Sequence, residues 1–572
     1  DIEGHVVVSG NWQYSTGSVN AANSTVYLRV MNSTARVVSG SMTFGNLTFM
    51  AASTTSTVNI ASGTVLTVNG TLTTTEVNSL LLNTGEIRAR GNIRIENSGS
   101  TGGGTTQVVV DGSGDQELSG TATSGSGALP NMRIAKTSGK FIVRDIITCA
   151  GNWVYESGIA EAASGSTLVL RGSFSLDGEG TSGGVMLFHH LLIHSGTRTV
   201  AGKFNARGNL GILSGAVLSA TGTSHIINVG GRWTNQNTTG GWNAGNTSVV
   251  FDGGGDLEIF RMGGAAETFT NIAFNRIDGR TTLKCTLNVT GSMTLTKGRI
   301  IAATGRHLSF ADNATCTGGG AGAYVCGPVR KTGNDAFVFP LGDTLLVDSV
   351  AWHPLAMSAP VTSSEYEATY LHKASDNANG AKADTLDNVS NCEYWVFERK
   401  TGTADVVLTF SWNQSSCLAN GTEDMTMAKW SGTQWERLAS TIVSYNDIVG
   451  QIALNASISA STPIQFVIAT NKLSTLFVPS SSVLDGFTAR SFGKKLYVIY
   501  DEKYIGGSLN YSIYDMQNTP INTASAPVNK VYGRNWLIFD LSLIPGLYLN
   551  KYYILEIQNE KGQKEYVRFC LK

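Results

Sequence analysis

Four aspartates in the first half of the chain have a type and spacing that could bind a cation or support acid–base catalysis. Residues 107–118 read QVVVDGSGDQEL and residues 248–259 read SVVFDGGGDLEI, so one D-G-x-G-D segment is written twice. The aspartates are Asp111, Asp115, Asp252 and Asp256. Carboxylates beside glycine turns can ligate Ca²⁺, and paired carboxylates can cleave glycosidic bonds. Because aspartate and glycine also suit a tight turn, we favour a turn and keep calcium and catalysis as alternatives.

The chain has one histidine cluster, formed by His189, His190 and His194. Strand alternation would place His190 and His194 on one face, where they could ligate a metal. No cysteine or carboxylate stands at a fixed spacing from them, so we favour solvated or packed histidines. No G-x-S-x-G, phosphate-binding or dinucleotide-binding motif occurs in a workable context. We therefore expect no catalytic residue, no enzymatic activity and no cofactor other than the possible Ca²⁺.

The seven cysteines lack metal-ligand spacing, since there is no C-x-x-C and no Cys/His pairing. Two short-range disulfides are expected. Cys392 and Cys417 flank strand-like runs, and Cys316 and Cys326 are close in sequence. The alternative is seven reduced, buried thiols. Disulfides would place the chain outside the cytoplasm.

An internal repeat organises the region that contains these residues. Each strong copy reaches an asparagine in an apolar run and, twenty residues later, a glycine that opens a new strand pattern. Two weaker units have similar spacings of 24 and 18 residues. The four pairs are Asn46 and Gly70, Asn131 and Gly151, His190 and Gly208, and Asn271 and Gly291. Short strands and glycine turns at this spacing suit coils that stack and bury their Val, Ile and Leu.

Residues 1–320 are therefore predicted to form a β-solenoid, with a right-handed parallel β-helix favoured. A string of small β-sandwiches is the alternative. It is disfavoured because the turns contain little proline and the units lack linkers.

The composition agrees with an all-β protein of several domains. The 572 residues include 66 Gly and only 10 Pro, and 15% are charged. A net charge of −1 argues against nucleic acid or an anionic membrane as the main partner. No apolar run approaches the roughly 20 residues that span a bilayer, so no transmembrane segment is expected. The chain begins with Asp1 and shows no signal peptide, which suggests a processed or partial product.

Composition changes near Gly320. Residues 323–470 carry longer strand patterns and five tryptophans, which predict an Ig-like antiparallel β-sandwich with the tryptophans in its core rather than on a sugar-stacking platform. Residues 471–483 form a linker. Residues 484–572 alternate aromatic and aliphatic residues and predict a small C-terminal antiparallel β-sandwich.

The last ninety residues carry an ordered set of motifs. A strand ends in Tyr514-Asp515, and a Leu-x-x-Gly-x-Tyr turn, a strand, a glycine hairpin and a final strand follow. The remaining motif residues are Leu543, Gly546, Tyr548 and Gly562. This order resembles the C-terminal sorting domain of cargo proteins of the type IX secretion system. The usual Tyr-Pro-Asn-Pro opening and the glycine after Tyr-Asp are absent, which bears on the subtype.

The resemblance implies an extracellular or cell-surface protein exported across the outer membrane of a Gram-negative bacterium. Residues 484–572 would bind the type IX translocon and its outer-membrane shuttle and attachment proteins, and would then be cleaved or retained. The segment 324–342 is similar to one often found before such tails in large repetitive surface proteins. Asp-Ser/Thr-apolar patterns, common in bacteria with this system, predict O-glycosylation at Thr344, Ser349 and Thr385.

Our leading hypothesis is a non-enzymatic secreted or surface-displayed structural or adhesin-like protein. The solenoid would be a stiff spacer or adhesive stalk, the sandwich a junction and the tail the export and anchoring signal. A β-helix protein that binds or degrades a surface polysaccharide is the alternative. A self-assembling filament subunit is a third possibility, because an uncapped coil offers unpaired strand edges to another molecule.

Overall fold

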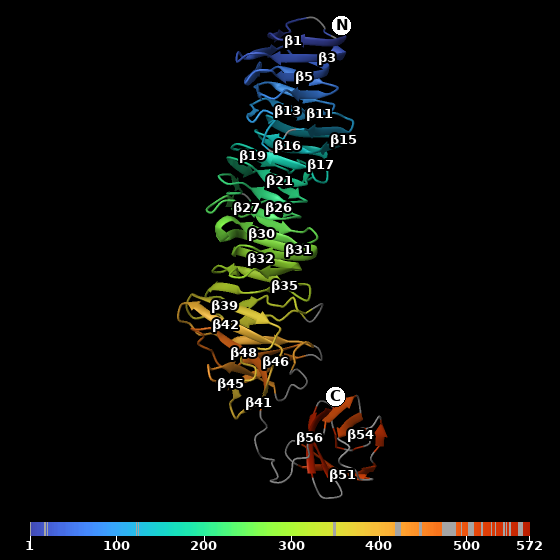
Figure 1. Ribbon diagram of the computed structural model, residues 1–572, viewed down its shortest axis with the longest axis vertical. Helices are drawn as coiled ribbons and strands as arrows, with labels where there is room; N and C mark the ends of the chain where they lie inside the picture. Colours follow the sequence, from blue (N-terminus) through green and yellow to red (C-terminus); the bar gives the residue numbers. More distant parts are fainter. Residues whose placement is uncertain are drawn as a thin grey trace. The chain divides into compact units, whose positions relative to one another are not determined.

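The computed structural model has a long parallel solenoid, an antiparallel sandwich and a small C-terminal β unit (Figure 1). It describes residues 2–471 except 17–18, 20, 122, 124, 223, 347–350, 418–424 and 446–448. It also describes residues 488–571 except 493–494, 501–507, 516–518, 528, 532–533, 541–543, 545, 548–550 and 559–563. The chain divides into two compact units, residues 1–420 with 425–471, and residues 421–424 with 472–572.

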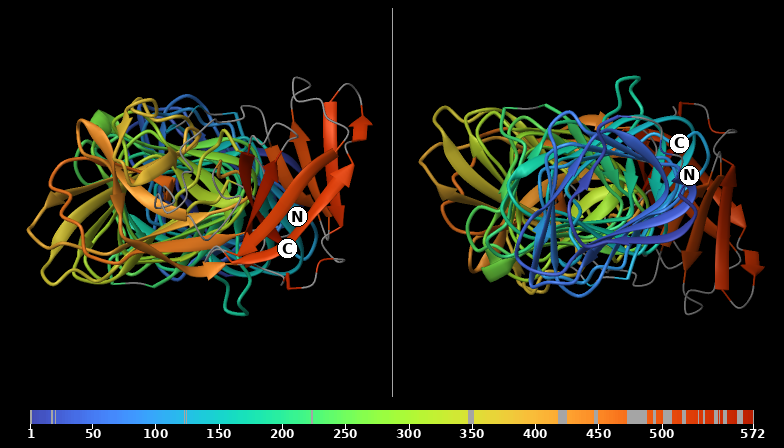
Figure 2. Two further views of the ribbon diagram at one scale, coloured as in Figure 1. Left: turned by 90° about the horizontal axis from the view of Figure 1, so that it is seen from below. Right: turned by 90° about the horizontal axis from the view of Figure 1, so that it is seen from above.

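The solenoid is built from short strands that pair in parallel with the strand one coil later. For example, β10 (Glu86–Ala89) lies between β7 (Val65–Val68) and β13 (Gln107–Val110), with Val65, Glu86 and Gln107 in register. Successive coils overlie one another along the solenoid (Figure 2). The all-β class and the parallel solenoid predicted from the repeat are confirmed, and a string of sandwiches is excluded for this region.

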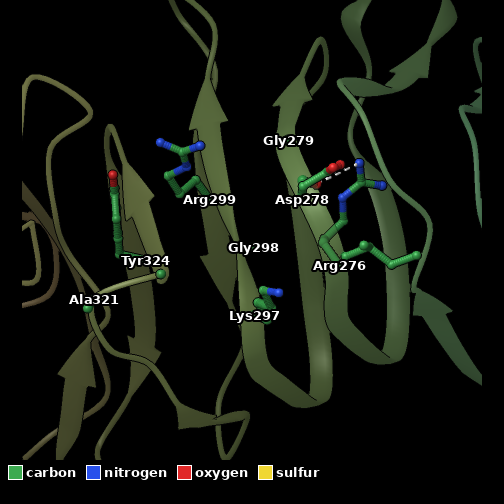
Figure 3. Close-up of a pocket in the computed structure, with 10 residues that line it drawn as sticks. Arg276, Asp278, Gly279, Lys297, Gly298, Arg299, Ala321 and Tyr324 are labelled. Atoms are coloured by element: carbon green, nitrogen blue, oxygen red, sulfur yellow. Dashed lines mark hydrogen bonds between the residues drawn. The ribbon is translucent and has the colours of Figure 1, made fainter. Parts of the chain in front are cut away.

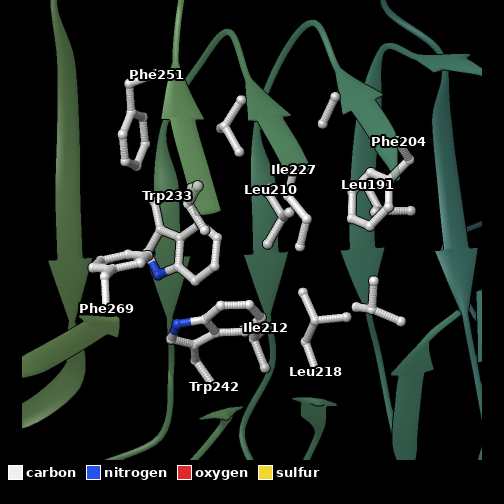
Figure 4. Packing of buried hydrophobic residues seen from close by; sticks show 14 of the residues in the cluster. Leu191, Phe204, Leu210, Ile212, Leu218, Ile227, Trp233, Trp242, Phe251 and Phe269 are labelled. Carbon is white, nitrogen blue, oxygen red and sulfur yellow. The ribbon is translucent and has the colours of Figure 1, made fainter. Parts of the chain in front are cut away.

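The interior is filled by apolar side chains that stack from coil to coil. Leu191 of β21 (His190–Ile193), Leu210 of β24 (Leu210–Ile212) and Trp233 of β27 (Trp233–Asn235) occupy successive register positions and are buried (Figure 4). Trp233 meets Trp242 edge to face, with ring centroids 5.2 Å apart, and Phe269 at 5.0 Å. Each coil thus covers the apolar face of the coil before it, which no coil could bury alone.

A hydrogen bond between coils explains the spacing of the repeat. In all four units a side chain accepts the backbone N–H of the residue that directly follows the glycine. The donor–acceptor pairs are Thr71 N to Asn46 Oδ1 at 2.7 Å, Asn152 N to Asn131 Oδ1 at 2.9 Å, Asn209 N to His190 Nδ1 at 2.9 Å, and Ser292 N to Asn271 Oδ1 at 3.2 Å. The spacing read in the sequence is therefore one coil, and it satisfies a backbone donor at a turn.

Parallel pairing continues beyond residue 320, and one strand belongs to both solenoid and sandwich. Strand β36 (Val329–Gly333) pairs in parallel with β33 (Leu308–Phe310) and antiparallel with β39 (Ser364–Leu371). One sheet continues through β42 (Tyr394–Thr401), β48 (Ile464–Asn471), β44 (Met425–Trp430) and β45 (Gln434–Leu438). The facing sheet contains β37 (Phe337–Phe339), β38 (Leu355–Met357), β43 (Leu408–Trp412), β47 (Gly450–Leu454) and β46 (Ser440–Tyr445).

Aromatic contacts join the two sheets of this sandwich. Trp395 and Phe410 have ring centroids 5.4 Å apart, and Phe339 and Phe397 are 6.2 Å apart. Trp395, Trp412 and Trp435 are buried, which agrees with core positions, whereas Trp352 and Trp430 are half-buried. The predicted antiparallel sandwich is confirmed.

One of the two predicted disulfides is present. Cys392 and Cys417 are bonded, with a Cα–Cα distance of 6.1 Å. The predicted Cys316–Cys326 pair was wrong, because both thiols are free. Cys316 is in register with Met293 and Cys326 with Ile301 of the same strand, β32 (Leu287–Ala302). Eight residues at about 3.3 Å each separate these register positions, far more than a disulfide spans.

The C-terminal unit consists of two antiparallel four-stranded sheets, as predicted. They are β49 (Thr488–Phe492), β50 (Lys495–Tyr500), β54 (Arg534–Asp540) and β53 (Asn529–Val531), and β52 (Pro520–Pro527), β51 (Ser508–Asp515), β55 (Lys551–Gln558) and β56 (Lys564–Leu571). Tyr514 and Asp515 end β51. Leu543, Tyr548, Gly562 and linker residues 472–483 lie outside the described residues. In the part of the chain that is described, no helix is long and apolar enough to cross a membrane.

Candidate functional site: a basic cleft in the second repeat

The duplicated aspartates hold neighbouring coils together. Asp115 Oδ1 accepts the backbone N–H of Lys140 at 2.8 Å, and Asp256 Oδ1 accepts that of Arg280 at 2.9 Å. Asp111 pairs with two arginines of the coil before it, and Asp252 accepts a hydrogen bond from Asn228. Since corresponding acids in the two copies make corresponding contacts, these observations favour the turn interpretation.

A buried cation lies under each D-G-x-G-D turn, and sequence reasoning missed it. Lys136 is 1% exposed, and its Nζ donates to Gly112 O at 2.7 Å, Gly114 O at 2.8 Å and Gln116 Oε1 at 2.8 Å. Arg276, which corresponds to Lys136 when the two copies are aligned at Asn131 and Asn271, is also 1% exposed and donates to the carbonyl oxygen of Gly255. The only sign of this buried cation in the sequence is that Lys136 and Arg276 occupy the same position of the repeat.

The buried ammonium bears directly on the calcium alternative. Two carbonyl oxygens and one amide oxygen of the first turn already accept hydrogen bonds from the Lys136 ammonium, and Asp111 and Asp115 have the partners described above. Among the described residues, no group of three or more His, Cys, Asp or Glu side chains could hold a metal ion.

The three histidines have separate contacts. His190 Nδ1 accepts the inter-coil hydrogen bond described above, in the place of the asparagine of the other units. His189 Nδ1 accepts the backbone N–H of Gly165 at 3.2 Å. His194 packs near Gly125, and burial lowers its pKa and that of His190. These contacts support packed histidines rather than a shared metal site.

Each strong repeat contains the same backbone bulge. In β31 (Glu267–Leu283), residues 276–279 lie between the register pairs Asn275–Lys297 and Arg280–Arg299, opposite the single residue Gly298. In β15 (Asn131–Val143), residues 136–139 are likewise opposite Gly158 of β17 (Trp153–Ala162). Gly158 and Gly298 have φ of 95° and 133°, which favours glycine. The bulge moves one strand outward from the solenoid wall.

In the second repeat, this bulge borders a cleft with a volume of about 480 Å³ (Figure 3). Its walls come from β31, from β32 and from residues 321–324 at the start of β35 (Ala323–Cys326). Lys297 and Arg299 flank Gly298, and Arg299 is in register with Tyr324. In the described part of the chain, neither Lys297 nor Arg299 has a carboxylate within ion-pair distance.

Three cations, Arg276, Lys297 and Arg299, line the cleft together with one carboxylate, that of Asp278. Burial lowers the pKa of Arg276, and the nearby Asp278, Asp256 and Asp252 oppose that shift. Burial raises the pKa of Tyr324, and the neighbouring Arg299, which hydrogen-bonds its side chain, opposes that shift. Asp278 is the single carboxylate among the residues that line the cleft. The cleft therefore lacks the carboxylate pair that glycoside hydrolysis usually needs.

A second polar cluster lies inside the sandwich. His353 Nε2 is 3.1 Å from Ser415 Oγ, and His353 Nδ1 is 3.7 Å from Glu393 Oε2. The three side chains thus follow the order of the nucleophile, base and acid in a catalytic triad. However, Ser415 Oγ donates to Asn413 Oδ1 at 2.8 Å, and the fully buried His353 stacks on Tyr370 at 4.2 Å. Burial raises the pKa of Glu393 to about 7. We interpret the cluster as a buried polar network beside the disulfide.

The sequence matches no protein-family model and no curated protein. Among solved structures, the crystal structure of the Group B Streptococcus pullulanase SAP is 17% identical and aligns with 30% of this chain and 22% of that chain. Its TM-score of 0.11 is too low to support an argument about fold or activity. The fold itself defines the class: a parallel β-solenoid joined to an antiparallel β-sandwich.

Proposed function

We propose that this chain is a non-enzymatic, extracellular structural or adhesin-like protein whose solenoid serves as a stiff stalk. The observation that carries the proposal is the uninterrupted stacking of coils, with an apolar interior and backbone donors satisfied between coils. A β-solenoid is consistent with a surface or structural protein. The shared strand β36 fits this role, because it joins stalk and sandwich without a linker.

The C-terminal unit would be the export and attachment signal of the type IX system. Its strand order agrees with the motif order that suggested the resemblance. Asp515 Oδ1 accepts the backbone N–H of Thr519 at 2.7 Å, and Gly546 has a φ of 92°, a conformation that favours glycine at this position of the Leu-x-x-Gly-x-Tyr motif. Both features support a folded recognition unit at the end of the chain.

A truncation tests this assignment. In the native host, a chain lacking residues 484–572 should accumulate in the periplasm, whereas the full chain should reach the surface or the medium. A reporter protein fused to residues 472–572 should be exported, and the same reporter without them should not. Normal export of the truncated chain would refute the role of the tail.

The O-glycosylation sites remain part of this proposal. Thr385 is exposed in a turn before β41 (Leu386–Val389), where a transferase could reach it. Thr344 is half-buried, with its hydroxyl 3.8 Å from Cys326 Sγ, and Ser349 lies outside the described residues. We expect Thr385 to be the best acceptor of the three. An intact mass of the native protein without added hexose would exclude all of them.

A further inference from the structure

We propose that the cleft beside the second bulge, formed by Lys297, Arg299, Tyr324 and Ile277, binds a carboxylated polysaccharide. This inference goes beyond the stalk function, because it gives one position along the solenoid a ligand of its own. It does not depend on how the protein is exported.

The first argument comes from a comparison of the two repeat copies. Residues that only one copy carries cannot be required to form the bulge that both copies share. The backbone is the same in both copies, with four residues opposite one glycine. In the first copy, Ser157 and Ile159 flank that glycine, and in the second copy Lys297 and Arg299 occupy those positions. Since the first copy forms the bulge without any charge there, the two cations are not required by the fold.

The second argument concerns the partners of these cations. Two cations on neighbouring coils are paired, since Lys284 lies 3.5 Å from Glu258 and Arg330 lies 2.6 Å from Glu367, whereas Arg280 has no carboxylate within ion-pair distance among the described residues. Lys297 and Arg299 have no such carboxylate among the described residues, although both line the cleft. Two cations on either side of one residue repel each other, and a bound anion would relieve that repulsion. Arginine in particular can bind a carboxylate with two hydrogen bonds.

The shape and lining of the cleft favour a sugar polymer over a small anion. The volume of about 480 Å³ lies within the usual range of roughly 300–1,000 Å³ for ligand sites, and exceeds the size of a single phosphate or sulfate. Ile277 is 66% exposed at the wall and offers an apolar contact for the face of a sugar ring. Tyr324 is in register with Arg299 and 1% exposed, so it closes the wall of the cleft behind the two cations.

Calorimetric titration of the full chain with hexagalacturonate tests the proposal. The double variant Lys297→Gln, Arg299→Gln should weaken binding at least tenfold. A matched double variant, Arg94→Gln with Lys140→Gln, removes two exposed cations of the solenoid elsewhere and should change binding less than twofold. Thermal melting of both variants checks that they fold like the parent.

The proposal would be overturned if the parent chain did not bind hexagalacturonate, or if both double variants lost the same affinity. It would also be overturned if inorganic phosphate bound as tightly as the oligosaccharide, or if a single-stranded oligonucleotide bound more tightly. A neutral galactan hexamer should bind at least tenfold more weakly than hexagalacturonate. Equal binding of the two hexamers would also contradict the role given to Lys297 and Arg299.

Discussion

Replacement of Lys136 by methionine should destabilise the first D-G-x-G-D turn strongly and locally. The ammonium donates to three oxygens at 2.7–2.8 Å, and Gln116 extends the network to the carbonyl oxygens of Ala89 and Gly91 in the coil before it. Methionine keeps most of the side-chain volume, so the main cost is that of buried acceptors left without a donor. A buried acceptor left without its donor costs about 1–3 kcal/mol, so the loss of the three bonds should cost about 3 kcal/mol or more.

Hydrogen exchange resolved by residue is the suitable assay, because a repeat protein need not unfold in one step. The backbone N–H groups of Gly112 and Lys140 report on this turn through their bonds to Gln116 and Asp115. Since about 1.4 kcal/mol corresponds to tenfold, their exchange should accelerate by at least two orders of magnitude in Lys136→Met. The exposed Lys140→Met variant is the control and should change exchange less than threefold. Equal effects of the two variants would refute the role of the buried ammonium.

Three further predictions concern stability. Burial raises the pKa of Glu267 to about 7, so the folded chain holds a proton on this carboxyl at pH values where the unfolded chain has lost it. The free energy of unfolding should therefore fall by roughly 3 kcal/mol as the pH rises from the ordinary glutamate pKa to about 7. Thermal melts at pH 5 and 8 should show this fall in the parent chain and not in Glu267→Gln. Reduction of Cys392–Cys417, which are 25 residues apart, should cost the sandwich about 3 kcal/mol in denaturant unfolding, and an unchanged midpoint after reduction would contradict this. Asn271→Ala should lose about 1–2 kcal/mol of local protection at its partner amide, whereas Asn275→Ala, exposed on the same strand, should leave it unchanged.

The sequence predicted the fold class because one spacing was repeated. The asparagine accepts a hydrogen bond from the next coil, and the glycine twenty residues later lies where the backbones of the two coils come close together. The distance between them along the chain is therefore the length of one coil. The Cys316–Cys326 prediction failed because closeness along the chain is a poor guide in a solenoid. The two cysteines lie beside positions of one neighbouring strand, β32, that are eight residues apart.

The cleft was harder to foresee. Its lining residues come from three coils, and register between coils decides which of them meet. The aspartates attracted attention because they are duplicated. However, both copies keep them because both turns use them to hold neighbouring coils together. Lys297 and Arg299 differ between the copies, and alignment of the two repeats at Gly158 and Gly298 would have revealed them.

The strand shared by solenoid and sandwich has a mechanical consequence. Because β36 is hydrogen-bonded to β33 on one side and to β39 on the other, a load on the sandwich passes into the last coils through ladders of backbone hydrogen bonds as well as through the covalent chain. A flexible tether would let the two parts swivel under shear. Here the sandwich can separate from the solenoid only if the hydrogen bonds of one of these ladders break together, so β36 transmits force between the two parts.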